Sequence, residues 1–253
     1  MRTSAPLAAA LLLLASAGAG CAHGASARDK DTAIVHADIG AESVAAGRAQ
    51  DALRSYDESL RYDPDLAEAH LGRGVVLELG FGKVDEAEAE YRKAIQLKPT
   101  FAEAHNNLGQ LLARTGRLEE AVKEFDAATA IMLYREPWVA RCNKGQALWQ
   151  MGKKAEGIAE QKECLNFAPK YCQGWRELGR IQLLDGQTKD AVTSFEAYAR
   201  ACDKSADAQQ LLGSALLRGG QRAKAREAFQ RCAELGDGTA IGTDCRKSSE
   251  SLR

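Results

Sequence analysis

Seven cysteines and four histidines are the residues of this 253-residue chain with the richest chemistry. Thiols can be acylated, paired in disulfides or bound to zinc, and imidazoles can ligate a metal. No CxxC pair occurs, and the cysteine spacings fit no set of zinc ligands. His36, His70 and His105 are separated by 34 and 35 residues, but Trp175 occupies the equivalent place further along. We interpret that place as a packing position, and we expect neither a metal nor another cofactor.

The motifs of common catalytic sites are missing from the sequence. There is no nucleophile elbow, phosphate-binding loop or HExxH helix. We therefore predict that the protein is not an enzyme and has no small-molecule substrate. A rival hypothesis from a different class is an enzyme whose site is scattered across a groove. With 34 Lys and Arg against 35 Asp and Glu, the chain also lacks the positive charge that nucleic-acid binding requires.

Cys21 stands at the end of an apolar N-terminal segment. The apolar stretch, residues 7–19, has about two-thirds of the ~20 residues that a membrane-spanning helix needs. With the small residues 17–20 before it, the cysteine resembles the lipobox of bacterial lipoproteins, where it is acylated and becomes the new N-terminus. Gly18 departs from that pattern, which prefers an aliphatic residue. The alternative is cleavage near Gly20 by the ordinary signal peptidase, which would leave a free exported thiol.

The lipobox resemblance implies a lipid-anchored protein. Residues 1–20 would be a lipoprotein signal peptide, and residues 21–32, which are small and polar, a lipidated N-terminal tether. Several acyl chains anchor a protein firmly in a membrane. Because Ala22 follows the cysteine and no acidic residue appears before Asp29, the resemblance further implies sorting to the outer membrane, with the protein facing the periplasm.

A sixfold repeat organises the rest of the chain. A first glycine recurs at spacings of 34, 35, 36, 34 and 34 residues, and a small residue follows it after twelve residues, or thirteen in the second repeat. Four residues later comes an aromatic in every repeat but the fourth, which has Gln161. A second glycine between them fits a turn with a left-handed backbone. The first glycines are Gly40, Gly74, Gly109, Gly145, Gly179 and Gly213, and the turn glycines are Gly47, Gly82, Gly116, Gly152, Gly186 and Gly220.

These features predict helical hairpins, because small residues let two antiparallel helices approach closely and an aromatic fills the space one turn further along. The pattern resembles the tetratricopeptide repeat over residues 33–236. The resemblance implies an all-α fold, a right-handed superhelix (α-solenoid) of six tetratricopeptide helical hairpins whose neighbours bury each other's apolar faces. Residues 237–253 are polar and are predicted to form a C-terminal cap or tail.

The numbering within a hairpin indicates how four of the other six cysteines could pair. Residues that face each other in an antiparallel hairpin have a constant sum of residue numbers. In the fourth repeat the crossing pair sums to 306, and so do Cys142 and Cys164. In the fifth repeat the crossing pair sums to 374, and so do Cys172 and Cys202. We therefore expect a disulfide within each of these two hairpins.

Cys232 has no such mate, because its opposite residue is Gln210, and Cys245 in the tail is the partner that remains. An exported protein can keep disulfides, and each contributes about 3–4 kcal/mol by a loop-entropy estimate. The alternative is that Cys164 and Cys232 merely occupy a site where this repeat favours a small residue. The sequence alone does not decide the connectivity.

In tetratricopeptide proteins the first helix of each hairpin lines a concave groove, which implies where a partner would bind. The inward residues implied here make an apolar floor with Trp149 at its middle. Arg176 and Arg180, one turn apart, could bind a partner carboxylate; the alternative is that both are simply solvated. Aromatic and arginine side chains are favoured interface anchors. The predicted groove residues are Leu71, Val75, Leu79, Asn106, Gln110, Trp149, Arg176, Arg180 and Leu183.

The fourth repeat carries a more specific resemblance. An LYxxP turn followed by AxxNxG resembles the signature of the type IV pilus pilotins, the PilF, PilW and Tgl group, which are outer-membrane lipoproteins that help the pilus secretin to assemble. The family also carries a disulfide near this place, in agreement with a Cys142–Cys164 bridge. The residues that match are Leu133, Tyr134, Pro137, Ala140, Asn143 and Gly145.

The pilotin resemblance implies a non-catalytic assembly factor. Its partner would be the outer-membrane secretin subunit of the type IV pilus machine, and its activity would support secretin oligomerisation and pilus-dependent motility. The alternative function is a tetratricopeptide lipoprotein scaffold for peptidoglycan hydrolases or another cell-envelope complex.

Overall fold

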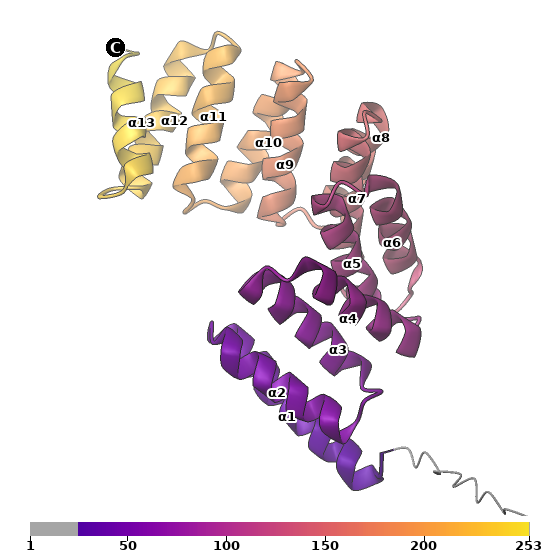
Figure 1. Cartoon of the computed structure of the whole chain (residues 1–253). Helices are drawn as coiled ribbons and strands as arrows, with labels where there is room; N and C mark the ends of the chain where they lie inside the picture. Colours follow the sequence, from indigo (N-terminus) through magenta and orange to yellow (C-terminus); the bar gives the residue numbers. More distant parts are fainter. Residues whose placement is uncertain (1–24, 253) are drawn as a thin grey trace, which may run out of the picture.

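The computed structural model describes residues 25–252, and within them the chain forms α-helices, one π-helical turn and no strand. Consecutive helices pair side by side in a curved array, with α1–α4 at one end, α9–α13 at the other and α5–α8 between them (Figure 1). The predicted all-α superhelix of six hairpins is confirmed. The helices are α1 Ala27–Ala45, α2 Ala49–Tyr62, α3 Ala67–Val75, η1 Val76–Gly80, α4 Val84–Leu97, α5 Ala102–Arg114, α6 Leu118–Ala130, α7 Pro137–Gln150, α8 Lys154–Phe167, α9 Cys172–Leu184, α10 Thr188–Ala201, α11 Ala206–Arg218, α12 Arg222–Leu235 and α13 Ala240–Glu250.

Each hairpin turns at a glycine with a left-handed backbone. The six predicted turn glycines all have positive φ, from 67° at Gly82 to 82° at Gly152. Residues with a Cβ atom are sterically strained in that conformation, whereas glycine, which has none, is not. The prediction for these glycines is confirmed, and it explains why the pattern keeps them.

In every hairpin but the fourth, the first glycine makes room for the aromatic of the second helix. A Cβ added at Gly109 would lie 2.6 Å from the ring of Phe125, and one added at Gly179 would lie 2.6 Å from the ring of Phe195. Both rings are fully buried. The ring therefore packs directly against the backbone of the partner helix, which any side chain in place of the glycine would prevent.

The unequal repeat spacings have two structural causes. In the second repeat the extra residue is absorbed by the π-helical turn at Val76–Gly80, since a π-turn accommodates one additional residue within a helix. Before the fourth repeat the linker from α6 to α7 has six residues, 131–136, where the other linkers between hairpins have four, as in 98–101. The spacings of 35 and 36 residues therefore mark a helix bulge and a longer linker.

The fourth hairpin, α7 with α8, has a different crossing. Gly145 faces Gly157, and a Cβ added at Gly157 would lie 2.6 Å from the carbonyl oxygen of Gly145. The helices are too close for an aromatic, and Gln161 takes that place, with its amide nitrogen donating to the carbonyl of Cys142 over 2.8 Å. The fourth repeat has no aromatic at this place, as its sequence shows, and the two backbones approach each other more closely there.

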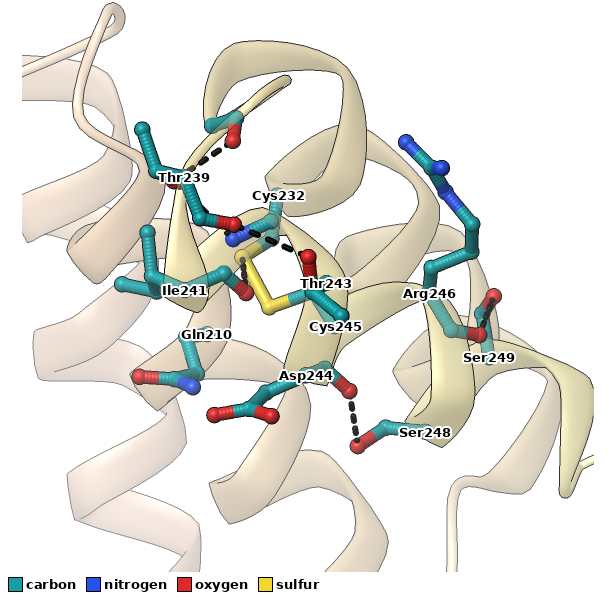
Figure 2. The surroundings of a disulfide bond; sticks show 12 residues. Gln210, Cys232, Thr239, Ile241, Thr243, Asp244, Cys245, Arg246, Ser248 and Ser249 are labelled. Atoms are coloured by element: carbon teal, nitrogen blue, oxygen red, sulfur yellow. Dashed lines mark hydrogen bonds between the residues drawn. A yellow bond between two sulfur atoms is a disulfide. The ribbon is translucent and has the colours of Figure 1, made fainter.

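The structure pairs the six cysteines in the three expected combinations. Cys142–Cys164 joins α7 to α8 with a Cα–Cα distance of 5.4 Å, and Cys172–Cys202 joins the ends of the fifth hairpin with a distance of 6.0 Å. The third bridge, Cys232–Cys245, links α12 to α13. Figure 2 shows it beside Thr239, which caps α13 by accepting a hydrogen bond from the backbone of Gly242. The C-terminal cap is therefore a helix fixed covalently to the last hairpin.

The first helix begins earlier than the sequence indicated. The side chain of Ser26 accepts a hydrogen bond from the backbone of Asp29, and the Asp29 carboxylate accepts one from the backbone of Ser26. This reciprocal capping box starts α1 at Ala27. The predicted tether over 21–32 is thus wrong for residues 27–32, because the capping box starts the helix before the repeat pattern begins.

Candidate partner-binding surface

A cavity of about 630 Å³ in the described chain is formed mainly by the first helices of the first four hairpins. Its walls are apolar for the most part, with Leu71 and Val75 from α3, Val44 from α1 and Val139 from α7. We call it the N-terminal hollow. It is lined by Ala41, Val44, Tyr56, Glu68, Leu71, Gly72, Val75, Phe101, Glu103, Asn106, Asn107, Tyr134, Arg135, Glu136 and Val139.

Carboxylates stand at the rim of the N-terminal hollow. Burial raises the pKa of Tyr134 to about 12, and the nearby charges of Glu103 and Glu136 add to the rise. The Tyr134 phenol therefore stays protonated and can donate a hydrogen bond. Glu68 is neutralised by Lys98, whose Nζ lies 2.7 Å from its Oε1. The uncompensated negative charge at the rim thus comes from Glu103 and Glu136, set against Arg135.

A second cavity, about 270 Å³, adjoins the hollow and has a different character. Its polar lining consists of Arg114, which is paired with Glu78, and of side-chain amides from three successive inner helices: Gln110 from α5, Asn143, Gln146 and Gln150 from α7, and Gln173 from α9. We call these five amide residues the amide cluster. Each amide offers donors and an acceptor together, so the cluster is suited to a ligand that presents both.

A hydrogen bond connects the two cavities. The amide nitrogen of Asn143, in the amide cluster, donates to the side-chain oxygen of Asn106 over 3.0 Å. Asn106 is only 5% exposed and lines the N-terminal hollow. The apolar hollow and the polar cluster therefore form one continuous surface across α3, α5, α7 and α9.

Four of the predicted groove residues lie on this surface. Leu71, Val75 and Asn106 line the N-terminal hollow, and Gln110 lines the amide cluster. Leu79 is 70% exposed and lines neither cavity, because the π-helical turn at Val76–Gly80 shifts the helix face on which it lies.

Trp149, predicted at the middle of the groove floor, lines neither of the two cavities. Its partly buried side chain packs against the apolar core of Ile158, Leu165, Leu178 and Ile181, which the fourth and fifth hairpins share. Its ring nitrogen is buried and has no hydrogen-bond partner in the described residues. The large ring is more stable in this core than at an open surface, since burial removes its apolar area from water.

The other predicted residues of the fifth repeat also have partners within the chain. Arg176 is paired with Asp207 at 2.9 Å, and Arg180 with Glu177 at 2.6 Å while its guanidinium lies 5.8 Å from the centre of the Trp149 ring. Leu183 packs against the C-terminal core. The cationic pair predicted to bind a partner carboxylate is therefore already neutralised by intramolecular carboxylates.

The sequence interpretation missed most of the amide cluster. Asn143, Gln146 and Gln150 follow one another at intervals of three and four residues, which places them on one helix face. That spacing was the available signal. Gln173 comes from the next hairpin and carried no local signal.

His70, His105 and Trp175 occupy equivalent places in their repeats, and each side chain bonds to the linker that precedes its helix. His70 Nε2 lies 2.9 Å from the carbonyl of Pro64, and His105 Nε2 lies 3.1 Å from that of Pro99. The indole nitrogen of Trp175 donates to the carbonyl of Pro169 over 2.8 Å in the same manner. These side chains therefore connect α3, α5 and α9 to the linkers before them.

The histidines also meet carboxylates on the second helix. His70 Nδ1 lies 2.6 Å from Glu90, and His105 Nδ1 lies 2.7 Å from Glu124. The hydrogen bond with Glu124 raises the pKa of His105, and burial opposes the rise. Residues 25–252 contain no group of His, Cys, Asp and Glu placed to hold a metal ion.

The predicted lipidation site, Cys21, lies outside the described residues. Over 25–252, no helix combines the length and apolar character needed to cross a bilayer.

Comparison with known proteins places the chain among repeat proteins. Models of the tetratricopeptide repeat match residues 82–116, 102–132, 140–171 and 176–238. The structure is similar to that of PilW, described as a widely conserved type IV pilus biogenesis factor, with a TM-score of 0.75 and 26% identity over 84% of this chain and 97% of that one. No sequence among the curated proteins matches.

Two further solved structures share the fold. The Pseudomonas aeruginosa PilF structure has a TM-score of 0.72 and 21% identity over 87% of this chain and 99% of that one. YrrB, described as a tetratricopeptide protein with an unusual peptide-binding site, has a TM-score of 0.53 and 16% identity over 76% of this chain and 97% of that one.

Proposed function

Because the chain is a tetratricopeptide-repeat protein of the PilF and PilW type, we propose that it acts in type IV pilus biogenesis as a pilotin. It binds the pilus secretin and promotes secretin assembly and oligomerisation in the outer membrane. In this role the protein performs no catalysis; it works by holding a partner, and pilus-dependent motility depends on it.

The observation that supports this proposal most strongly is the likeness to PilW over most of both chains. The match covers 84% of this chain and 97% of the PilW chain at 26% identity, so nearly the whole of that factor has a counterpart here. Repeat proteins share folds without sharing partners, and the biological role therefore rests on this one pairing, together with the LYxxP and AxxNxG motif at 133–145.

The N-terminal hollow is the surface we assign to the partner. Val44 is 39% exposed in its wall, and Leu71 and Val75 on α3 and Val139 on α7 extend the apolar surface across two more helices. Exposed apolar area in a concave site is typical of protein interaction surfaces. A secretin segment that covers this area would remove it from water and so bind with useful affinity.

The attachment to the membrane is a separate part of the proposal. Acylation of Cys21 would hold the protein on the periplasmic face of the outer membrane, where secretin subunits arrive. A Cys21→Gly variant should then appear in the soluble periplasmic fraction and should support fewer secretin multimers. Retention of the variant in the membrane fraction would show that another surface supplies the attachment.

The decisive experiment is a gene deletion followed by a blot of outer-membrane fractions for detergent-resistant secretin multimers. The proposal expects the multimers to be lost while secretin monomers persist, and plasmid-borne protein to restore them. Normal multimers in the deletion strain would reject the pilotin function and favour an envelope scaffold, whose partner crosslinking would identify.

A variant pair tests the N-terminal hollow directly. Val44→Asp places a charge in the wall of the hollow and should weaken secretin binding about tenfold, as expected for an anchor position. Val35→Asp is the matched control: it lies on the same helix, is 57% exposed and lines neither cavity. Equal binding by both variants would exclude the hollow as the docking site.

A further inference from the structure

The two adjoining cavities carry an inference about the form of the bound segment, which rests on the proposed function. We propose that the partner contributes an extended peptide segment whose main chain is hydrogen-bonded by the amide cluster. One apolar side chain of that segment fills the N-terminal hollow, and a basic residue stands beside it.

The amides of the cluster are available for a ligand. In the described part of the chain, the side-chain amide bonds on this surface run from Asn143 to Asn106 and from Asn106 to Asn107, and none involves the four glutamines. An extended peptide presents N–H and C=O groups that need partners, and a glutamine amide satisfies one of each. Four free amides around a cavity of about 270 Å³ therefore match a peptide main chain.

The arrangement of the helices fits an extended segment. The cluster draws on α5, α7 and α9, the first helices of three successive hairpins. Packed helices lie about 10 Å apart, so crossing all three takes roughly 20 Å, or about six residues at ~3.4 Å each. A helical peptide satisfies its own backbone groups and would leave the glutamines without partners.

The position of the hollow fixes where the anchor side chain must be. Asn143 of the amide cluster donates to Asn106 of the hollow, so the two cavities meet at this hydrogen bond. The anchor therefore lies within a few residues of the stretch held by the amides. Extended chains alternate their side chains, so the anchor and the residue two positions away point in the same direction.

The charge at the rim selects the neighbour of the anchor. Glu103 and Glu136 are exposed, and no ion pair neutralises either within residues 25–252, whereas Glu68 is paired with Lys98. Arg135 offsets one of these two charges, which leaves a net negative rim. A Lys or Arg next to the apolar anchor is therefore favoured over an acidic residue.

A glycan is the other ligand that amides bind, and the cavity is poorly suited to it. Sugar rings are usually held against an exposed aromatic face. The aromatic in the amide-cluster cavity is Phe125, which is 1% exposed and occupied by its own hairpin. The observations therefore favour a peptide.

The test uses overlapping 15-residue peptides that cover the secretin encoded in the same genome, measured by fluorescence anisotropy with the intact pilotin chain. Peptides that bind are then made with single N-methylated main-chain amides. The protein variant is Gln110→Met with Gln146→Met, which keeps side-chain length and removes both amides. Gln96→Met, exposed on α4 and outside both cavities, is the control.

The inference expects one peptide region to bind, and expects N-methylation at one position and the double variant each to weaken binding about tenfold. Because both changes remove the same hydrogen bonds, the two together should cost little more than either alone. Gln96→Met should bind like the wild type. Replacing the basic residue of the peptide by glutamine should weaken binding at low salt, and less at high salt.

Two results would overturn the inference while leaving the pilotin function intact. One is additive loss on combining N-methylation with the double variant. The other is a folded secretin fragment that binds when no peptide does. Binding of chitotetraose that the double variant abolishes would replace the peptide with a glycan. If neither peptides nor the secretin fragment bind, the proposed function fails together with the inference.

Discussion

The first three hairpins and the last three share one architecture but are held together differently. Every hairpin from α7 onward carries a disulfide, at Cys142–Cys164, Cys172–Cys202 and Cys232–Cys245, the last reaching into α13. Residues 25–130 contain no cysteine at all. Interhelical ion pairs occur in both halves, but in the first half they act without a covalent bridge, as in Arg117–Glu88 and the pairing of His70 and Arg73 with Glu90.

The difference teaches where covalent reinforcement is most needed. The hairpin of α7 and α8 lacks the buried aromatic of the others and has Gly145 against Gly157 at its crossing. Gln161 stands where the other hairpins bury an aromatic ring, and the bridge between Cys142 and Cys164 adds stability at this crossing. The N-terminal hollow lies largely on the other half, whose described residues contain no covalent bridge.

Reduction of the disulfides should produce the largest effect and should affect one half of the molecule. Each bridge closes a loop in the unfolded chain and thereby adds about 3 kcal/mol to the free energy of unfolding, by the chain-entropy estimate. Because solenoid repeats are stabilised mainly by their neighbours, we expect faster hydrogen exchange in α7–α13 under reductant and unchanged exchange in α1–α5. Equal acceleration in both halves would show that the array unfolds as one cooperative unit.

Replacing Trp149 should have the next largest effect and tests the junction between the two cross-linked hairpins. Trp149→Ala opens a cavity beside Ile158 and Leu178, with an expected loss of about 3 kcal/mol in urea unfolding. Trp149→Phe should recover most of that loss. A Trp149→Ala variant that keeps full stability yet loses secretin binding would restore the groove interpretation of this residue.

Adding a methyl group at the crossing of the fourth hairpin should have the third largest effect on stability. A Cβ at Gly145 would lie 2.8 Å from the carbonyl oxygen of Gly157, and backbone cannot move aside as a flexible side chain can. We expect Gly145→Ala to lower the unfolding free energy by about 2 kcal/mol, within the range for overpacking. Gly219→Ala is the matched control, since its nearest neighbours lie at 3.5 Å and its stability should change little.

Much of this fold could be predicted because its signals are local and periodic. The turn glycines have positive φ because the hairpin demands it, and the expected cysteine pairs face each other because antiparallel helices keep a constant numbering sum. The start of α1 at Ala27 was missed because one capping box, Ser26 with Asp29, outweighs the small polar composition around it.

The candidate site was harder to predict because it depends on side-chain direction and on contacts between repeats. Trp149 and Gln146 lie on the same helix, yet the indole turns into the core and the amide lines a cavity. Arg176 was expected to be free, but its partner Asp207 comes from the next hairpin. A single sequence does not record such pairings between neighbours.

The smallest expected effect is a pH dependence that belongs to the half without disulfides. Hydrogen bonding to Glu124 raises the pKa of His105 above its ordinary value of 6.5, so folding favours the protonated imidazole. The resulting stabilisation is fully present below about pH 6.5 and is lost as the pH rises through the higher pKa of the folded state. Trp175, at the equivalent place of the fifth hairpin, does not titrate.

The free energy of unfolding of the wild type, measured in urea, should therefore be lower at pH 8 than at pH 6. His105→Gln and Glu124→Gln should both reduce this difference, since either change removes the pair. The effect should be smaller than that of any disulfide, because the His105 side chain remains 11% exposed and the ion pair is partly solvated. Hydrogen exchange should assign the decline to α5 and α6. If the loss of stability at pH 8 were instead located in α7–α13, pH would act on the half with disulfides. The two halves would then not differ in the way proposed for His105 and Glu124.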